Sequence, residues 1–245
     1  MVVGAPPCTF FTNGLCPYAH RVALALSWKQ IAHERIEIDL SNKPSWYRKR
    51  LGTSLVPAVE IDGTPHAESL DILQLCEDVY DDATHYPSLV PSEPAQAAAA
   101  ASLVRHSAKL EAAGWALLGG AWNFPSSGGA PSAAAIKKWD EAMQVLADAL
   151  SKHGGPYLVG PTPTLADAAL APFVARFELA AEVCRGYSCR KANPALAAYM
   201  GALEASPAWG ETFPERAKFG EAIQKYGSLD YFDYHTASLA EPVPK

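Results

Sequence analysis

Hydrophobic and polar positions over the first 40 residues follow a strand–helix–strand pattern. The β-branched and aromatic run at residues 8–12 predicts a strand, which stops at Asn13-Gly14. Apolar positions at helical spacing over residues 22–28 then predict a helix. Residues 33–40 alternate between polar and apolar side chains, as a half-buried strand does. We therefore expect the two strands to pair in parallel through a right-handed crossover.

Short elements continue to about residue 80. A short helix is predicted over residues 45–51, and residues 58–61 and 64–67 read as two strands joined by the turn Asp62-Gly63, which is a hairpin signal. Residues 69–80 carry apolar positions at helical spacing. The resulting order of strands and helices is the thioredoxin-like arrangement.

Strand patterns disappear beyond a stretch rich in proline and serine, which is the composition of an exposed linker. We therefore predict a thioredoxin-like α/β domain over residues 1–85, a linker over 86–93 and an all-α helical domain over 94–245. The long helical patterns of the second domain cover residues 93–118, 133–153, 164–184 and 194–204.

Composition narrows the function classes. The 245 residues are 49% hydrophobic and 19% charged, and the formal net charge is −6, which argues against nucleic acid as a partner. No apolar stretch approaches the roughly 18 residues of a membrane span, so we expect no membrane partner. The N-terminus lacks a basic start followed by an apolar core, which predicts a cytoplasmic location. Five dispersed cysteines without a C-x-x-C pair indicate neither a disulfide framework nor a metal site.

Cys16 is the candidate nucleophile. It follows the Asn13-Gly14 turn and precedes Pro17, a residue typical of the first position of a helix. Unpaired backbone N–H groups and the helix dipole favour a thiolate there, so we expect a pKa below the usual value of about 8.5. The alternative is a small buried thiol at the top of the sheet. Position 19 is alanine, so a redox cycle at Cys16 needs an external thiol.

Two further motifs lie at strand ends. Val56-Pro57 precedes a strand in a thioredoxin-like sheet, a natural place for a cis peptide bond, although an ordinary trans proline is the commoner case. Glu68-Ser69 lies where the last strand meets a helix. Ser69 is predicted to cap that helix, whose N–H groups can bind a small carboxylate, while Glu68 suits an ammonium group. A plain N-cap is the alternative.

Other polar and aromatic residues are explained by structural roles. Residues 164–167 form a predicted capping box with Asp167 at its third helical position. His20 is interpreted as a surface residue of the first helix, with a role at the Cys16 thiol as the alternative. Several aromatic side chains are candidates for an apolar ligand cleft, although aromatics at helical spacing more often form core. They are Trp115, Trp122, Tyr187, Phe219 and Tyr226.

Five motifs in order along nearly the whole chain make it resemble a cytosolic glutathione transferase of the cysteine-bearing omega and lambda classes. They are Leu15-Cys16-Pro17-Tyr18-Ala19, Asn42-Lys43-Pro44-Ser45-Trp46-Tyr47, Leu55-Val56-Pro57-Ala58, Glu68-Ser69-Leu70-Asp71 and the capping box. The resemblance implies that Cys16 is catalytic and forms a mixed disulfide with the co-substrate glutathione. It also implies a glutathione site in which Lys43 pairs with the glycyl carboxylate, Val56 and Pro57 present the backbone, and Glu68 and Ser69 hold the γ-glutamyl end.

The same resemblance implies a second-substrate site lined by Trp115, Arg176, Phe219 and Tyr226. The implied activity is thiol transfer or glutathione-dependent reduction of a small or protein-bound disulfide, of dehydroascorbate or of another electrophilic substrate, by a monomer or homodimer. One alternative is a conventional conjugating transferase, against which a cysteine at position 16 argues. The other is a membrane-associating relative of the intracellular chloride channel family, whose first helix is more apolar than one containing His20, Arg21 and Lys29.

Overall fold

The computed structural model describes residues 5–40, 42–119 and 129–226, without the side chains of Lys218, Lys225 and Tyr226. Its sheet has the strand order β2-β1-β3-β4. The strands are β1 (Cys8–Thr12), β2 (Glu34–Glu37), β3 (Ala58–Ile61) and β4 (Thr64–Ala67). β1 and β2 are parallel, whereas β3 is antiparallel to both β1 and β4. The predicted parallel pairing of the first two strands and the predicted hairpin are thus confirmed.

The hairpin turn and the edge strand each have a local cause. Asp62 and Gly63 have φ values of 48° and 76°, the left-handed pair that a two-residue hairpin requires. β2 lies at the edge of the sheet and is shorter than the predicted residues 33–40, but Ile38 N–H still donates to Thr12 O at 2.8 Å. The extended chain therefore continues past the last paired residue of β2.

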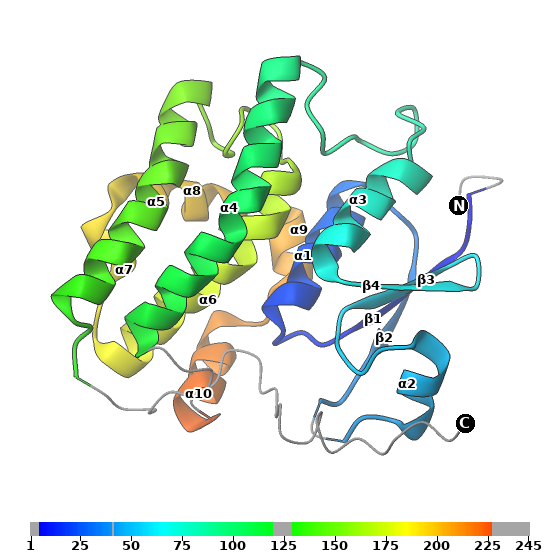
Figure 1. The fold of residues 1–245 in the computed structure, drawn as a ribbon, viewed down its shortest axis with the longest axis horizontal. Coiled ribbons are helices and arrows are strands. Elements are labelled where there is room, and N and C mark those ends of the chain that lie inside the picture. The colour runs from blue at the N-terminus through cyan, green and yellow to red at the C-terminus, as the bar shows by residue number, and fades with distance from the viewer. Residues whose placement is uncertain (1–4, 41, 120–128, 227–245) are drawn as a thin grey trace.

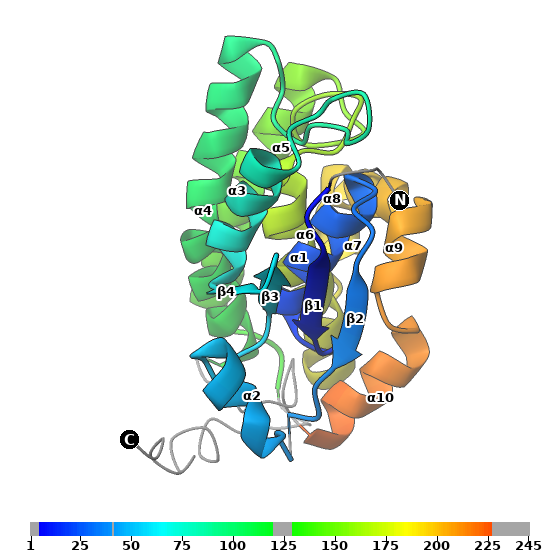
Figure 2. The ribbon, with the colours of Figure 1, turned by 90° about the vertical axis from the view of Figure 1, so that its right-hand side faces the viewer.

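Three helices accompany the sheet: α1 (Pro17–Trp28), α2 (Ser45–Leu51) and α3 (Ser69–Val79). α2 lies at one end of the sheet, whereas α1 and α3 lie between the sheet and the helical half of the molecule (Figure 2). Because it is covered on both sides, α1 buries nearly its whole length, from Pro17 to Leu26 with Tyr18 as the exception. The helix that follows Cys16 is therefore held from two directions.

The rest of the described chain is helical, with α4, α5 and α6 side by side and α10 below them (Figure 1). α5 and α8 have the predicted bounds, while α9 and α10 follow the last predicted helix. The helices are α4 (Pro94–Leu118), α5 (Ala133–His153), α6 (Leu165–Arg185), α7 (Cys189–Ala192), α8 (Pro194–Glu204), α9 (Pro207–Thr212) and α10 (Arg216–Tyr226). A thioredoxin-like domain followed by an all-α domain is therefore confirmed as the fold class.

α6 forms the centre of the helical half. Most of its residues are buried on every side, as in a helix surrounded by others. At its crossing with α4, Gly114 lies against the Phe177 ring with no room for a Cβ atom. The small side chain thus permits the close approach of α4 to α6.

The start of α6 is anchored by the predicted capping box. Thr164 donates its backbone N–H and hydroxyl to Asp167 Oδ2, at 2.8 and 2.9 Å. Asp167 Oδ1 accepts from Leu158 N–H at 3.0 Å and from the Tyr199 hydroxyl at 3.1 Å. The fully buried carboxylate therefore joins the preceding loop, α6 and α8, a larger role than a cap alone.

Charged side chains connect α1 with the helical half. Arg21 donates from Nη2 to Glu111 Oε1 of α4 at 2.7 Å and from Nε to Ala169 O of α6 at 2.8 Å. Tyr18 donates its hydroxyl to Glu111 Oε2 at 3.0 Å, and the Arg21 guanidinium lies 4.3 Å from the Phe173 ring centroid. These contacts fix the orientation of the N-terminal turns of α1 relative to α4 and α6.

Candidate active site

Cys16 occupies the N-cap of α1, as predicted. Its backbone N–H donates to Asn13 O at 3.1 Å, and its carbonyl accepts from His20 N–H at 3.0 Å, the first hydrogen bond of the helix. Pro17 takes the first helical position. The thiol donates to Val56 O across 3.6 Å and is 3% exposed. The sulfur thus lies between the positive end of a helix dipole and the backbone of residue 56.

The Val56–Pro57 peptide bond is cis, so of the two forms left open by the sequence the structure has the one that the strand order suggested. The segment before it is held by the Tyr47 hydroxyl, which donates to Leu55 O at 2.8 Å. Tyr47 belongs to α2, so α2 and the cis-proline segment form one wall beside Cys16. The polar atoms of Val56 and the Cys16 sulfur are brought together by this arrangement.

Glu68 and Ser69 lie at the start of α3, but the N-cap is one residue earlier than predicted. The helix begins at Ser69 and Glu68 occupies the N-cap, without a side-chain capping bond, so the prediction of Ser69 as the cap is wrong. Glu68 has φ 67°, a conformation that costs a residue with a side chain about 1–3 kcal/mol and is concentrated at functional sites. Its side chain is exposed.

Arg21 fixes the Ser69 side chain. Its Nη1 donates to Ser69 Oγ at 3.2 Å, and Ser69 is 6% exposed. As the acceptor in that bond, the hydroxyl keeps its own hydrogen for a carboxylate. Lys43, the remaining member of the predicted glutathione site, is half-buried just before α2. Hydrogen bonds therefore connect Ser69 to α1, the helix that follows Cys16, and α2 to the cis-proline segment.

The predicted second-substrate residues separate into three groups. Trp115 is half-buried on α4, with its ring edge-to-face with Phe177 at 5.2 Å. Arg176 and Phe219 are 0% and 2% exposed, so the expectation that they line the second-substrate site is revised: both are interior side chains. The Tyr226 side chain and Trp122 lie outside the described part of the chain.

His20 is buried, so its interpretation as a surface residue is wrong. It is 2% exposed, its ring lies 4.9 Å from that of Trp209, and its Nε2 is 3.0 Å from Thr212 Oγ1. Burial lowers the pKa of His20 well below its ordinary value, and the positive charges of Arg176 and Arg35 lower it further. The imidazole is therefore neutral in the folded protein at neutral pH.

This burial predicts an acid-dependent loss of stability. Below pH about 6.5 the unfolded chain protonates His20 while the folded chain does not, so the free energy of unfolding falls as pH decreases. Denaturant titrations of the wild type and His20→Asn at pH 7.5 and 5.5 measure it. We expect the wild type to lose about 1.4 kcal/mol more than the variant over that interval. Equal losses would show that His20 is protonated in the folded state.

The other four cysteines differ from Cys16 in their surroundings. Burial raises the pKa of Cys8 to about 11, of Cys76 to about 12 and of Cys189 to about 12, and it also raises that of Cys184. Thiols with such pKa values carry little thiolate at neutral pH. Cys189 begins the four-residue helix α7, where burial still raises its pKa, whereas Cys16 lies at the N-cap of the longer helix α1.

Arg21 and Glu111, which hold Ser69 and the first turn of α1, were not predicted from the sequence as site residues. An arginine in a helix whose neighbours are mostly apolar was the available signal, because such a helix is covered on both sides and its charge needs a buried partner. The partner, Glu111, is 90 residues away along the chain. Sequence spacing gave no means of pairing the two.

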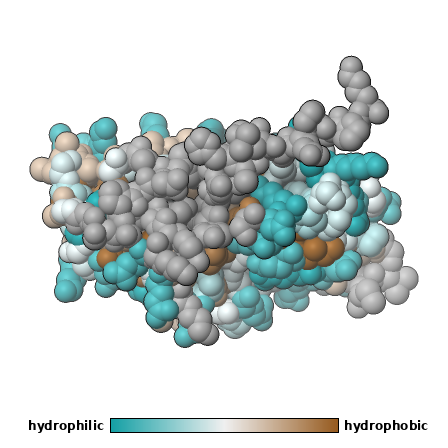
Figure 3. Space-filling model, turned by 90° about the horizontal axis from the view of Figure 1, so that it is seen from below, coloured by the Kyte–Doolittle hydropathy of each residue, from teal (hydrophilic) through white to brown (hydrophobic). Residues whose placement is uncertain are grey.

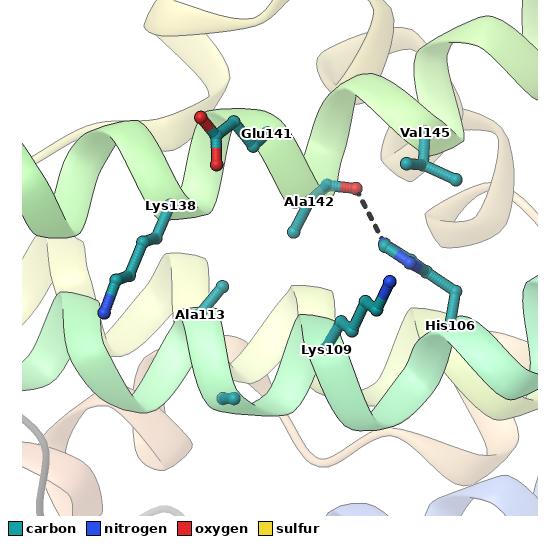
Figure 4. Close-up of a pocket in the computed structure, with 8 residues that line it drawn as sticks. His106, Lys109, Ala113, Lys138, Glu141, Ala142 and Val145 are labelled. Atoms are coloured by element: carbon teal, nitrogen blue, oxygen red, sulfur yellow. Dashed lines mark hydrogen bonds between the residues drawn. The ribbon is translucent and has the colours of Figure 1, made fainter.

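Away from Cys16, a groove of about 500 Å³ runs between α4 and α5 (Figure 4). His106 Nε2 lies 3.1 Å from Ala142 O at one end, and Lys109 and Lys138 border the opening. None of the predicted site residues lines this groove. It is therefore distinct from the candidate site.

On the face seen from below, hydrophobic residues form separate areas between hydrophilic ones where described residues are visible (Figure 3). No described helix has the length and apolar character needed to cross a bilayer. In the same part of the chain, no group of three or more His, Cys, Asp or Glu side chains is arranged to hold a metal ion.

Solved structures of similar size share this fold. Glutathione transferase Omega 3C from Trametes versicolor is 27% identical, with a TM-score of 0.72 over 89% of this chain and 90% of that one. Dehydroascorbate reductase from Chlamydomonas reinhardtii is 25% identical, with a TM-score of 0.71 over 90% of this chain and 98% of that one.

Sequence comparison gives the family. Glutathione S-transferase L2, chloroplastic, from Arabidopsis thaliana is 28% identical over 215 residues, which are 86% of this chain and 66% of that protein. Residues 15–79 match the glutathione S-transferase N-terminal domain, and residues 93–202 match the glutathione S-transferase C-terminal domain. The chain therefore belongs to the glutathione transferase family.

Proposed function

We propose that this protein is a glutathione-dependent thiol transferase that reduces mixed disulfides through Cys16. The observation that carries the proposal is the position of the Cys16 thiol, at the N-cap of α1 and 3.6 Å from Val56 O beside a cis proline. A cysteine there attacks sulfur, whereas a hydroxyl at the same place can only stabilise the thiolate of glutathione. The similarity to lambda and omega transferases supports the same assignment.

The reaction consists of two thiol–disulfide exchanges. In the first, the Cys16 thiolate attacks the glutathione sulfur of a mixed disulfide, the old S–S bond breaks, and the other thiol leaves as a thiolate that takes up a proton. In the second, the thiolate of another glutathione attacks the Cys16 adduct, releasing oxidised glutathione and restoring the Cys16 thiolate. In total one glutathione thiol is oxidised: its sulfur joins the glutathione sulfur already present in the mixed disulfide, and the substrate thiol is released in its reduced form.

Glutathione is proposed to bind along the wall that includes Val56 and Pro57. There, the Val56 backbone pairs with the cysteinyl part and places the glutathione sulfur beside Cys16. Lys43 pairs with the glycyl carboxylate, and Glu68 and Ser69 bind the γ-glutamyl ammonium and carboxylate. The buried Ser69 hydroxyl, oriented by Arg21, supports this assignment.

The charge of Glu68 is expected to contribute to this affinity. A charged hydrogen bond contributes roughly 1.5–3 kcal/mol, so Glu68→Ala should weaken glutathione binding on the order of tenfold. Titration calorimetry of reduced glutathione provides the measurement. Glu68→Gln, which keeps the side-chain length, should show a similar loss, and Glu141→Ala at an exposed position of α5 should show none. Unchanged affinity in a folded Glu68→Ala protein would remove Glu68 from the site.

Mass spectrometry of the intact protein tests the central step. After treatment with oxidised glutathione, we expect one added glutathione, located on Cys16 by peptide mapping and removed by excess reduced glutathione. Absence of the adduct, or its location on another cysteine, would refute the mechanism.

The second substrate is proposed to enter on the side of Trp115, the half-buried aromatic of α4. Protein-bound and small disulfides are the proposed substrates. Dehydroascorbate is a further candidate, because one of the similar solved structures is a dehydroascorbate reductase.

Five free thiols fit a reducing compartment, and we propose that the protein is located in the cytoplasm. One relative is chloroplastic, so cell fractionation is the direct measurement.

A further inference from the structure

Arg176 holds the loop that leads to Cys16. Its Nε donates to Leu15 O at 2.9 Å and its Nη2 to Gly14 O at 3.2 Å. Its Nη1 donates to Pro172 O of its own helix and to His20 Nδ1 of α1, both at 3.1 Å. A side chain of α6 thus binds the two residues that immediately precede the nucleophile and one that follows it by a single helical turn.

The hydrogen bonds determine the tautomer of His20. Its Nδ1 must accept, because the guanidinium only donates, so the ring hydrogen lies on Nε2 and is donated to Thr212 Oγ1 at 3.0 Å. The Thr212 hydroxyl is in turn donated to Ala208 O at 2.6 Å. The rings of Trp209 and Phe213 enclose the imidazole. The network therefore runs from α9 through α1 to α6 and ends on the loop before Cys16.

Cys16 lies between the two points at which this network binds the chain. On the N-terminal side, the carbonyls of residues 14 and 15 point to Arg176, and Leu15 N–H donates to Asn13 Oδ1 at 3.0 Å. On the C-terminal side, His20 N–H donates to Cys16 O at 3.0 Å while the His20 ring accepts from the same guanidinium. Movement of Cys16 along α1 requires at least one of these bonds to break.

We propose that Arg176 and His20 are positioning residues that set the geometry of the Cys16 sulfur for attack on a disulfide, with Thr212 fixing the His20 tautomer. Both act through the backbone around Cys16. The proposal rests on the proposed function, since it assumes that Cys16 is the attacking thiol. A misplacement of about 1 Å at a reacting centre can cost on the order of 100-fold in rate, so loss of either side chain is expected to slow the exchange.

The test compares Arg176→Met, His20→Leu and His20→Asn. For each variant, the rate of adduct formation with oxidised glutathione is measured from pH 5 to 9. The midpoint of the pH–rate curve gives the pKa of the Cys16 thiol, and its plateau gives the limiting rate of the thiolate. Arg176→Met and His20→Leu should lower the limiting rate by on the order of 10- to 100-fold. His20→Asn should remain within about threefold of the wild type, since its Oδ1 can accept from Arg176 where Nδ1 does.

Lys29→Met is the matched control for loss of a buried cation. Lys29 is 1% exposed, pairs with Glu77 at 2.9 Å and donates to Pro87 O at 3.3 Å, away from the Cys16 loop. Lys29→Met should lower the melting temperature and leave the limiting rate of adduct formation unchanged. If Arg176→Met does not fold, the pair His20→Leu and His20→Asn decides.

Two results overturn the proposal: a folded Arg176→Met or His20→Leu protein with the wild-type limiting rate, or equal losses in His20→Leu and His20→Asn. Failure of the proposed function is a different result, in which the wild type forms no adduct on Cys16 at any pH. In that case alkylation of Cys16 by iodoacetamide across the same pH range still measures the effect of the variants on the thiol. Identical alkylation profiles would then overturn the positioning role as well.

Discussion

Cys16→Ser should abolish disulfide reduction, with a loss on the order of 1,000-fold or more, in a protein that remains folded. A hydroxyl cannot form or resolve a mixed disulfide, and removing an attacking group entirely has effects of this size. The small change in volume at an N-cap leaves the helix intact, because serine is itself a favoured N-cap residue. A coupled assay with a glutathione mixed disulfide measures the loss, and thermal melting verifies the fold.

The same variant is expected to gain another activity. A serine hydroxyl at the N-terminus of α1 can donate a hydrogen bond to the thiolate of bound glutathione, which then attacks an electrophile such as chlorodinitrobenzene. Disulfide reduction and conjugation should therefore change in opposite directions. Opposite changes in the two activities would also distinguish the proposed function from that of a conventional conjugating transferase. In such an enzyme the wild type would already catalyse conjugation.

The other cysteines provide the control for Cys16. Replacing Cys8, Cys76, Cys184 and Cys189 with alanine, singly and together, should leave the disulfide reductase rate per folded molecule unchanged, because burial raises the pKa of each thiol. Full activity in Cys16→Ser, or its loss when these four are replaced, would place the reactive thiol elsewhere.

Elements with local signals could be predicted from the sequence. The Asp62-Gly63 hairpin follows from two residues that accept a left-handed backbone, and α2, α5 and α8 have the predicted bounds. The start of α1 at Pro17 follows from a residue that favours the first helical position. In each case the deciding interactions lie within a few residues along the chain, and for this reason the position of Cys16 was predictable too.

Long-range pairing was not predictable in this way. His20 and Arg176 are 156 residues apart, and Arg21 and Glu111 are 90 residues apart, so no spacing rule relates them. Each side chain is polar and therefore reads as a surface residue until its partner is known. Arg176 was assigned to the second-substrate site by resemblance alone, whereas in the structure its buried guanidinium donates to the carbonyls of Leu15 and Gly14.

Asp167→Ala is expected to destabilise the protein by about 3–5 kcal/mol, far more than a cap at a helix end contributes. The carboxylate is fully buried and accepts four hydrogen bonds, from Thr164 N–H, the Thr164 hydroxyl, Leu158 N–H and the Tyr199 hydroxyl. Each buried donor left without an acceptor costs about 1–3 kcal/mol, and partial relaxation recovers some of the total.

Denaturant titration and thermal melting should both show this loss, while calorimetry should show a glutathione affinity within about twofold of the wild type, because none of the four donors belongs to the proposed glutathione site. Tyr199→Phe removes a single donor together with its need for an acceptor, and should cost about 1 kcal/mol. Asp140→Ala, at an exposed position of α5, should cost nothing measurable. A variant that melted normally but no longer bound glutathione would move Asp167 from the framework of α6 into the binding site.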